Sequence, residues 1–163
     1  REIRGIDIPR IGLLNMGIEA SKGNKVIKEA AKLMRSSSMN FIGYVEGNNL
    51  VEDTADVVVC DGFTGNIALK TMEGSVRLVF RFIEDAFNSS AFNKFSSITS
   101  KFALNQAKDK IDPRRYNGAL LLGLNGVVVK SHGDSDSMGV QHALITAIEE
   151  AKKDIVDKLI GAF

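Results

Sequence analysis

Cysteine is nearly absent from this sequence of 163 residues, in which Cys60 is the single example. One thiol cannot form an internal disulfide, so the composition favours a reducing compartment. An excess of one charge is also missing, because 21 Lys and Arg residues almost balance 20 Asp and Glu residues. No global field is therefore expected to attract nucleic acid or an anionic membrane.

Long hydrophobic runs are missing as well. The longest candidate, residues 119–129, is interrupted by Gly123, Asn125 and Gly126, whereas a membrane-spanning helix needs about 20 mostly apolar residues. The first four residues, Arg1-Glu2-Ile3-Arg4, lack the apolar core of a signal peptide. We therefore expect a cytoplasmic protein that does not cross a membrane.

Short apolar runs predict the strands of a parallel sheet. Three of them cover residues 10–15, 40–45 and 56–60. The last run is continuous rather than alternating, as expected for a parallel strand covered on both faces. A fourth region, residues 119–130, predicts two short strands around Asn125-Gly126, a dipeptide typical of hairpins.

Apolar residues at helical spacing lie between these runs, in stripes over residues 26–34, 69–87 and 140–159. The order of strands and helices predicts one α/β unit with an open, mostly parallel sheet flanked by helices. Six of the nine phenylalanines fall between Phe80 and Phe102, on both sides of a break at residues 88–90. This pattern predicts a helical hairpin over about residues 76–111 that projects from the sheet.

Three glycine-rich loops follow predicted strands, which is where open α/β sheets bind ligands. They comprise residues 15–24, 61–66 and 130–137. Glycines allow backbone amides to approach an anion, and a helix N-terminus adds about half a positive charge. Hydrogen-bond donors and cations in or just after these loops are Lys22, Thr64, Asn66, Lys70, Ser131, His132 and Ser135. This inventory suits phosphate, whereas no phosphate-binding motif of nucleotide-binding proteins is present.

Each loop also has a purely structural interpretation. Gly62 and Gly65 could simply shape a strand-to-helix turn, and Thr64 could cap the following helix. Ser135 or Asp136 is a natural N-cap of the last helix. Cys60 fits a small buried residue at a strand end better than a nucleophile. From the residues alone, the structural and the functional interpretation of each loop both stay open.

Taken together, the strands and loops resemble the acyl-carrier-protein:phosphate acyltransferase family of bacterial phospholipid synthesis. The matching stretches are residues 10–15, 22–24, 41–47, 55–66, 69–71, 121–128 and 132–133, and the segment from Cys60 to Asn66 is the most specific. The family's chains are roughly twice this length, so the resemblance is to their C-terminal half. It implies a Rossmann-like, three-layer α/β/α fold of the isocitrate-dehydrogenase type.

The implied reaction joins a fatty acyl group from acyl carrier protein to inorganic phosphate, without cofactor or metal. Phosphate is itself the nucleophile, so the enzyme supplies orientation and donors for the thioester oxyanion. The resemblance assigns catalysis to Asn66, Lys70 and His132. It assigns phosphate or acyl binding to Lys22, Asp61, Gly62, Gly65, Ser131, Gly133 and Ser135. Since half of the cleft is then missing, the isolated chain should be inactive.

The resemblance also implies a homodimer with peripheral membrane contact, with Phe87, Phe92 and Phe95 of the hairpin as the contact residues. A more distant likeness to phosphotransacetylases, which act on short acyl-CoA, rests on the segments 61–70 and 131–133. The apolar hairpin favours long acyl chains over acetyl groups. A third alternative is a non-catalytic module for dimerisation or membrane docking.

Overall fold

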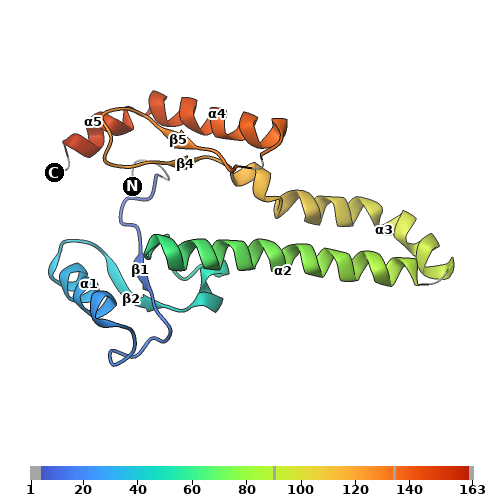
Figure 1. Cartoon of the computed structure of the whole chain (residues 1–163), viewed down its shortest axis with the longest axis horizontal. Helices are drawn as coiled ribbons and strands as arrows, with labels where there is room; N and C mark the ends of the chain where they lie inside the picture. Colours follow the sequence, from blue (N-terminus) through green and yellow to red (C-terminus); the bar gives the residue numbers. More distant parts are fainter. Residues whose placement is uncertain (1–4, 90, 134, 162–163) are drawn as a thin grey trace. The chain divides into compact units, whose positions relative to one another are not determined.

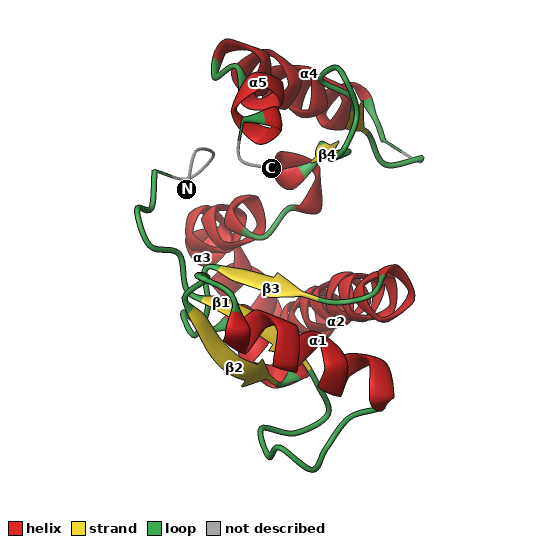
Figure 2. Cartoon of the chain, turned by 90° about the vertical axis from the view of Figure 1, so that its left-hand side faces the viewer, coloured by secondary structure: helices red, strands yellow, loops and turns green. Residues whose placement is uncertain are grey.

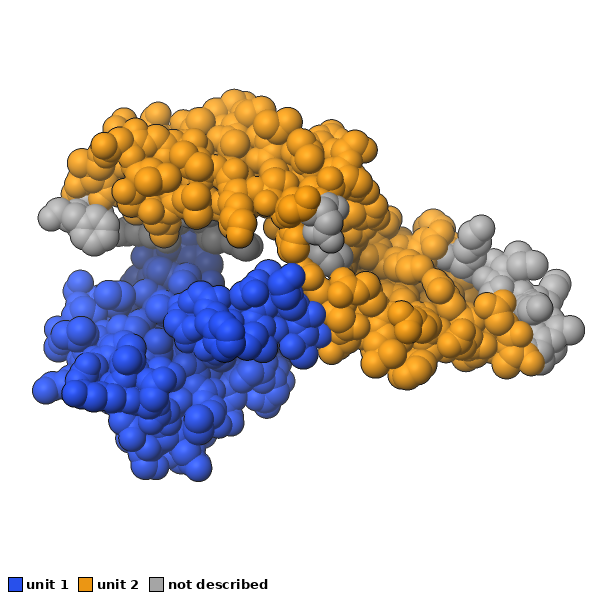
Figure 3. Space-filling model, in the orientation of Figure 1, with its two compact units in different colours: residues 1, 3–72 blue, residues 2, 73–163 orange. Residues whose placement is uncertain are grey.

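The computed structural model describes residues 5–89, 91–133 and 135–161, without the side chains of residues 91–99, 101 and 113. The chain divides into two compact units, the first ending at Met72 and the second beginning at Glu73 (Figure 3). This boundary falls inside one long helix, α2 (Gly62–Asn88).

The first unit is built on a three-stranded parallel sheet (Figure 1). Its strands are β1 (Ile11–Leu14), β2 (Phe41–Val45) and β3 (Val57–Val59), in the order β2-β1-β3. The helix α1 (Lys25–Ser36) connects β1 to β2, and the short 3-10 helix η1 (Gly47–Val51) precedes β3. All three strands predicted from the apolar runs are confirmed.

The core of this unit lies between α1 and the two strands β1 and β2 (Figure 2). Leu13 from β1 and Ala31 and Met34 from α1 form its buried centre. Partly buried hydrophobic residues surround them, namely Ile11, Ile27, Ala30, Phe41 and Tyr44. The predicted apolar stripe of residues 26–34 therefore does face the sheet, as an amphipathic helix requires.

The prediction that β3 is covered on both faces is wrong for the described chain. Val57 and Val59 are 47% and 42% exposed. The reason is that α1 packs on β1 and β2, and the core cluster of the described residues includes no residue of β3. A continuous apolar run is typical of a strand with two covered faces, but the run does not itself provide the covering elements.

An ion cluster fixes the starts of β1 and β3. The Arg10 guanidinium donates hydrogen bonds to both carboxylate oxygens of Asp56, at 3.1 and 3.0 Å, and to the Asp53 carboxylate at 2.8 Å. The Arg10 backbone N–H also donates to Asp56 at 2.7 Å. These hydrogen bonds from Arg10 lower the pKa of Asp56 to about 2, because they stabilise the charged carboxylate.

The second helix of the hairpin is α3 (Ala91–Lys110), so the predicted break between two helices is confirmed. The two helices lie side by side (Figure 1), with Lys108 Nζ donating to Glu84 Oε1 at 2.7 Å and lying 5.4 Å from the Phe80 ring centroid. Phe87 is half-buried, whereas the side chains of Phe92 and Phe95 lie outside the described residues. Within the described part of the chain, no helix is both long and apolar enough to cross a membrane.

The remainder of the second unit begins with the 3-10 helix η2 (Pro113–Tyr116). Two short strands follow, β4 (Ala119–Leu120) and β5 (Val129–Lys130), which pair antiparallel and confirm the predicted hairpin. In the described residues β4 and β5 form a sheet of their own. This pair is antiparallel, whereas the sheet of the first unit is parallel.

The C-terminal apolar stripe is divided between two helices, α4 (Ser137–Lys152) and α5 (Ile155–Ile160). The break occurs at Asp154, whose φ of 50° is left-handed and cannot continue a right-handed helix. Leu144 and Ile148 of the stripe are 59% and 53% exposed. The buried face of α4 instead carries Gly139, Ala143 and Glu150.

Candidate functional site

The loop between β5 and α4 is organised by one buried side chain, Asn117. Its amide nitrogen donates to Ser131 Oγ and Ser135 Oγ, both at 2.9 Å, and to the Gly139 carbonyl at 2.8 Å. Its oxygen accepts a hydrogen bond from the His132 backbone N–H at 2.9 Å. One amide thus connects η2, the loop and the first turn of α4.

Because of this amide, two predicted anion ligands lie next to each other. The hydroxyl oxygens of Ser131 and Ser135 are 3.1 Å apart. Both side chains are half-buried, whereas His132 and Gly133 in the same loop are exposed. The predicted ligands Ser131, His132, Gly133 and Ser135 therefore lie in a polar and accessible part of the chain before the N-terminus of α4.

The start of α4 has a carboxylate as its cap, as the structural interpretation of this loop anticipated. Asp136 is the N-cap and accepts a hydrogen bond from Gly139 N–H at 3.0 Å. It also accepts a hydrogen bond from Arg114 Nη1 at 2.8 Å, and Arg114 in turn binds Asp112. The Gly139 amide and then Arg114 lower the pKa of Asp136, and Arg114 lowers the pKa of Asp112.

His132 has an acidic neighbour from the same unit. Its Nε2 lies 3.7 Å from Glu73 Oε1, and the Glu73 side chain is only 14% exposed. A largely buried carboxylate beside an exposed imidazole can help to orient the ring. Sequence reasoning did not identify Glu73.

The loop that opens α2 is capped by Asp61. Its carboxylate accepts hydrogen bonds from Thr64 N–H at 2.8 Å and from Thr64 Oγ1 at 2.6 Å, and these bonds lower its pKa. Asp61 is therefore the cap, whereas the structural interpretation gave that role to Thr64. Because an anionic side chain already occupies part of this helix N-terminus, a bound phosphate would have to use other donors.

The expectation that Cys60 is buried is wrong, since its side chain is exposed. It lies at the end of β3, against the first turn of α2. A Cβ atom at Gly65 would come within 2.8 Å of the Cys60 sulfur. A side chain at position 65 would therefore require the exposed Cys60 side chain to move, and this packing gives Gly65 a structural role that needs no ligand.

Asn66 and Lys70 are both exposed on α2. Their spacing of four residues places both on one face of the helix within the first unit. His132 and its neighbour Glu73 belong to the second unit. The predicted catalytic residues Asn66 and Lys70 therefore share one helical surface.

The loop after β1 places Lys22 on the surface. Asn15 is buried beneath this loop and donates to the Gly17 carbonyl at 3.0 Å. Gly23 has a φ of +86°, and a Cβ there would come within 2.6 Å of the Asn15 amide oxygen. Packing on Asn15 explains Gly23, whereas a Cβ at Gly17 would meet the side chains of Glu19 and Lys22. Among the described residues, no hydrogen bond or ion pair joins Lys22 to another predicted ligand.

The most informative residue that sequence reasoning missed is Asn117. Its local signal was the dipeptide Asn117-Gly118, which is typical of a turn, and Gly118 does adopt a φ of +115°. The partners of Asn117 lie 14 to 22 residues further along the chain. No local pattern indicates such contacts. Among the described residues, no cluster of His, Cys, Asp and Glu side chains is arranged to hold a metal ion.

Comparison with known proteins identifies the family to which this chain is similar. A family model described as "Fatty acid synthesis protein" matches residues 1–158. A phosphate acyltransferase of Paramagnetospirillum magneticum is 50% identical over 165 residues, which cover 100% of this chain and 47% of that protein. The phosphate acyltransferase of Albidiferax ferrireducens is 46% identical, covering 96% of this chain and 46% of its own length.

A third relative, the phosphate acyltransferase of Nitrosococcus oceani, is 47% identical over 94% of this chain and 45% of its own length. The chain thus spans somewhat less than half the length of the curated relatives that it matches. The family match covers almost every residue of the chain, including the loops at residues 61–66 and 130–137. The chain belongs to the fatty acid synthesis protein family.

Proposed function

We propose that this chain is the C-terminal part of an enzyme that transfers a fatty acyl group from acyl carrier protein to inorganic phosphate. The relatives are named phosphate acyltransferases and match the chain over 94–100% of its length. The proposal includes a three-layer, isocitrate-dehydrogenase-like fold for the complete enzyme and a cytoplasmic location.

The observation that carries the proposal is the hydroxyl cluster at the start of α4. Ser131 and Ser135 both accept hydrogen bonds from Asn117, and Ser131 donates towards Ser135. A hydroxyl rotates to suit its acceptor, so Ser131 and Ser135 can each donate a proton to an anion at this loop. A loop with hydroxyl donors, an exposed glycine and a following helix N-terminus is suited to phosphate.

The reaction needs no covalent intermediate with the protein, because phosphate is itself the nucleophile. A phosphate oxygen attacks the carbonyl carbon of the thioester, the carbon–sulfur bond breaks, and the departing thiolate takes up a proton. Asn66 would donate to the developing oxyanion, and Lys70 would balance the charge of phosphate. His132, oriented by Glu73, would supply the proton to the thiolate.

A chimera tests the proposal, because the chain spans less than half of its relatives. We would replace the matching segment of the Paramagnetospirillum magneticum protein with this chain. The chimera is incubated with palmitoyl-acyl carrier protein and phosphate, and acyl phosphate is trapped with hydroxylamine. We expect turnover that is lowered about 100-fold or more by Asn66→Ala and about 100-fold or more by His132→Ala. Full activity in both variants would refute the assigned roles.

The same assay separates the alternatives. Turnover of acetyl-CoA but not of the acyl-carrier-protein thioester would favour the phosphotransacetylase alternative. Absence of turnover with either substrate, in a chimera that folds and dimerises, would favour a non-catalytic module. Acyl phosphate formed by the isolated chain would refute the expectation that the chain alone lacks half of its cleft.

A homodimer with peripheral membrane contact through the hairpin is part of the proposal. Its support is the density of phenylalanines in the hairpin, which include the half-buried Phe87. Flotation of the chimera with liposomes tests it. Phe92→Asp or Phe95→Asp should abolish flotation, and unchanged flotation in both variants would contradict the contact.

A further inference from the structure

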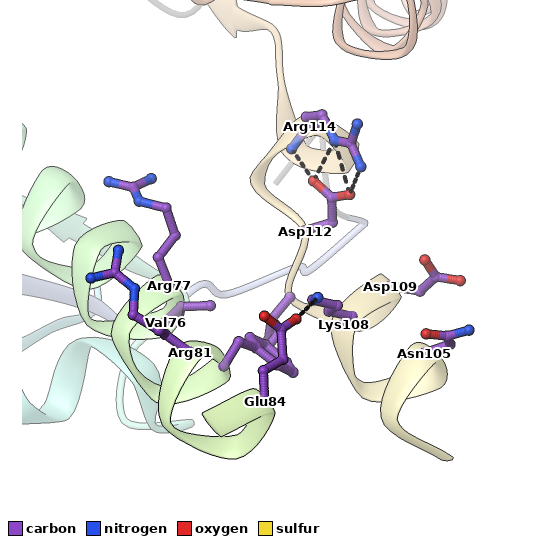
Figure 4. Close-up of a pocket in the computed structure, with 11 residues that line it drawn as sticks. Val76, Arg77, Arg81, Glu84, Asn105, Lys108, Asp109, Asp112 and Arg114 are labelled. Atoms are coloured by element: carbon purple, nitrogen blue, oxygen red, sulfur yellow. Dashed lines mark hydrogen bonds and ion pairs between the residues drawn. The ribbon is translucent and has the colours of Figure 1, made fainter. Parts of the chain in front are cut away.

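A pocket of about 520 Å³ lies between α2 and α3, at the base of the hairpin (Figure 4). Its volume falls within the range typical of small-molecule sites. It lies entirely in the second unit and involves none of the residues predicted for catalysis or phosphate binding. Its lining includes the apolar side chains Val76, Phe80 and Ile111.

The acidic groups of the pocket are already paired. Glu84 binds Lys108 at 2.7 Å, Asp112 binds Arg114 at 2.6 Å, and Asp109 lies 3.5 Å from Arg115. Two cations of the lining, Arg77 and Arg81, have neither a hydrogen bond nor an ion pair with any described residue. The lining residues carry four positive and three negative charges, so the pocket has a net charge of +1, with Arg77 and Arg81 as its two cations that lack an acidic partner among the described residues.

Arg77 and Arg81 are four residues apart on α2, so their side chains emerge about one turn from each other. Figure 4 shows both leaving the helix in the same direction, apart from the Glu84–Lys108 pair. Two like charges at this spacing destabilise a helix slightly, and an anion between them removes that repulsion. Guanidinium groups are well matched to phosphate and carboxylate, which accept paired hydrogen bonds.

We propose that this pocket binds an anionic amphiphile, that is, a single alkyl chain with a phosphate or carboxylate head group. The head group is held by Arg77 and Arg81, and the alkyl chain lies on Val76, Phe80 and Ile111. The inference concerns binding alone and does not depend on the proposed acyl transfer. A probe that cannot react therefore tests it separately.

The experiment is calorimetric titration of the chain with dodecyl phosphate below its critical micelle concentration. Inorganic phosphate and a dodecyl trimethylammonium salt are the comparison ligands. We expect dodecyl phosphate to bind at least tenfold more tightly than either. Shortening its chain should weaken binding by roughly fourfold for each buried methylene that is removed.

The double variant Arg77→Gln, Arg81→Gln should lose at least tenfold in affinity. Its matched control is Lys28→Gln, Lys32→Gln, which removes two exposed cations at the same spacing from α1 and should leave binding unchanged. Circular dichroism verifies that both variants are folded.

Several results would overturn the inference. Equal loss in both double variants would indicate a general charge effect, and equal binding of the cationic amphiphile would indicate a detergent-like interaction. Binding of inorganic phosphate as tightly as dodecyl phosphate would remove the alkyl site. Binding to phosphatidic acid vesicles without binding to monomeric dodecyl phosphate would assign the two arginines to a membrane surface instead.

Discussion

At the scale of single residues, two side chains with distant partners hold the loops and strands in place. The Asn117 side chain makes four hydrogen bonds that hold the loop between β5 and α4 in place. Arg10 binds the Asp56 carboxylate and thereby links the start of β1 to the start of β3. Neither is an apolar core residue. Asn117 is buried, so its polar groups must find their partners within the protein, whereas Arg10 is partly exposed and acts as the cation of an ion cluster.

Replacing Asn117 with Asp should destabilise the second unit and disorder the loop at residues 131–135. The substitution keeps the shape but removes the amide donors and places an acceptor against the Gly139 carbonyl. We expect a loss of about 1–3 kcal/mol for each buried group left unsatisfied, measured by urea unfolding. Gln106→Ala, at an exposed position on α3, is the control, and equal effects of the two substitutions would contradict this role for Asn117.

The Arg10–Asp56 pair predicts a pH dependence of stability. The pKa of Asp56 is lowered to about 2 from its ordinary value of 3.8, so its contribution is complete above pH 3.8 and is lost as the pH falls towards 2. Asp56→Asn should therefore lower the melting temperature at pH 6. The difference from the parent protein should shrink between pH 4 and pH 2.

Thermal unfolding at pH 6, 4 and 3 measures this dependence, with Asp85→Asn at an exposed position of α2 as the control. A difference between parent and Asp56→Asn that stays constant over this range would show that the carboxylate charge is not responsible.

At the scale of elements, polar side chains cap the first turns of the helices. Asn24 caps α1 by accepting a hydrogen bond from Ile27 N–H at 3.0 Å, and Asp136 caps α4. Polar caps satisfy backbone N–H groups that have no partner within the helix. Of the caps predicted from the sequence, Asp136 is confirmed, whereas Thr64 was wrong because Asp61 caps α2. The αL residue Asp154, whose signal is weak, was not recognised as a helix break.

Asn24→Ala should destabilise the first unit by about 1 kcal/mol, because the first turn of α1 loses its cap. Lys28→Ala, at an exposed interior position of the same helix, should have a much smaller effect. Chemical unfolding followed by circular dichroism measures both. A loss in Asn24→Ala no larger than that in Lys28→Ala would show that the cap contributes little here.

At the scale of the whole molecule, the exposed apolar rows are the main departure from an ordinary surface. Leu144 and Ile148 on α4 and Val57 and Val59 on β3 are each more than 40% exposed. Relatives of this chain are more than twice as long. Apolar rows of this kind are typical of surfaces that contact further protein.

Polar substitutions in the exposed apolar row of α4 should therefore change stability differently in this chain alone and in the chimera. In this chain alone, Leu144→Ser with Ile148→Ser should reduce binding of a hydrophobic dye without loss of stability. In the chimera with the Paramagnetospirillum magneticum segment, the same substitutions should cost about 1–3 kcal/mol in all, because the hydroxyls are then buried. Glu149→Ser on the same helix is the control. Equal stability changes in the two contexts would contradict coverage of this row.

The sequence by itself determined the positions of β1, β2, β3, α1, the long helix α2 and the hairpin break, together with the membership of the family. These follow from apolar periodicity, caps and loop motifs, which act between neighbouring residues. Only the tertiary structure decided that Asn117 joins Ser131 to Ser135 and that Cys60 is exposed. It also decided that, among the described residues, β4 and β5 form their own sheet and that Arg77 and Arg81 line a pocket without an ionic partner. Hydrogen bonding, burial and ion pairing between distant residues depend on how the elements pack, and local sequence patterns carry little information about that packing.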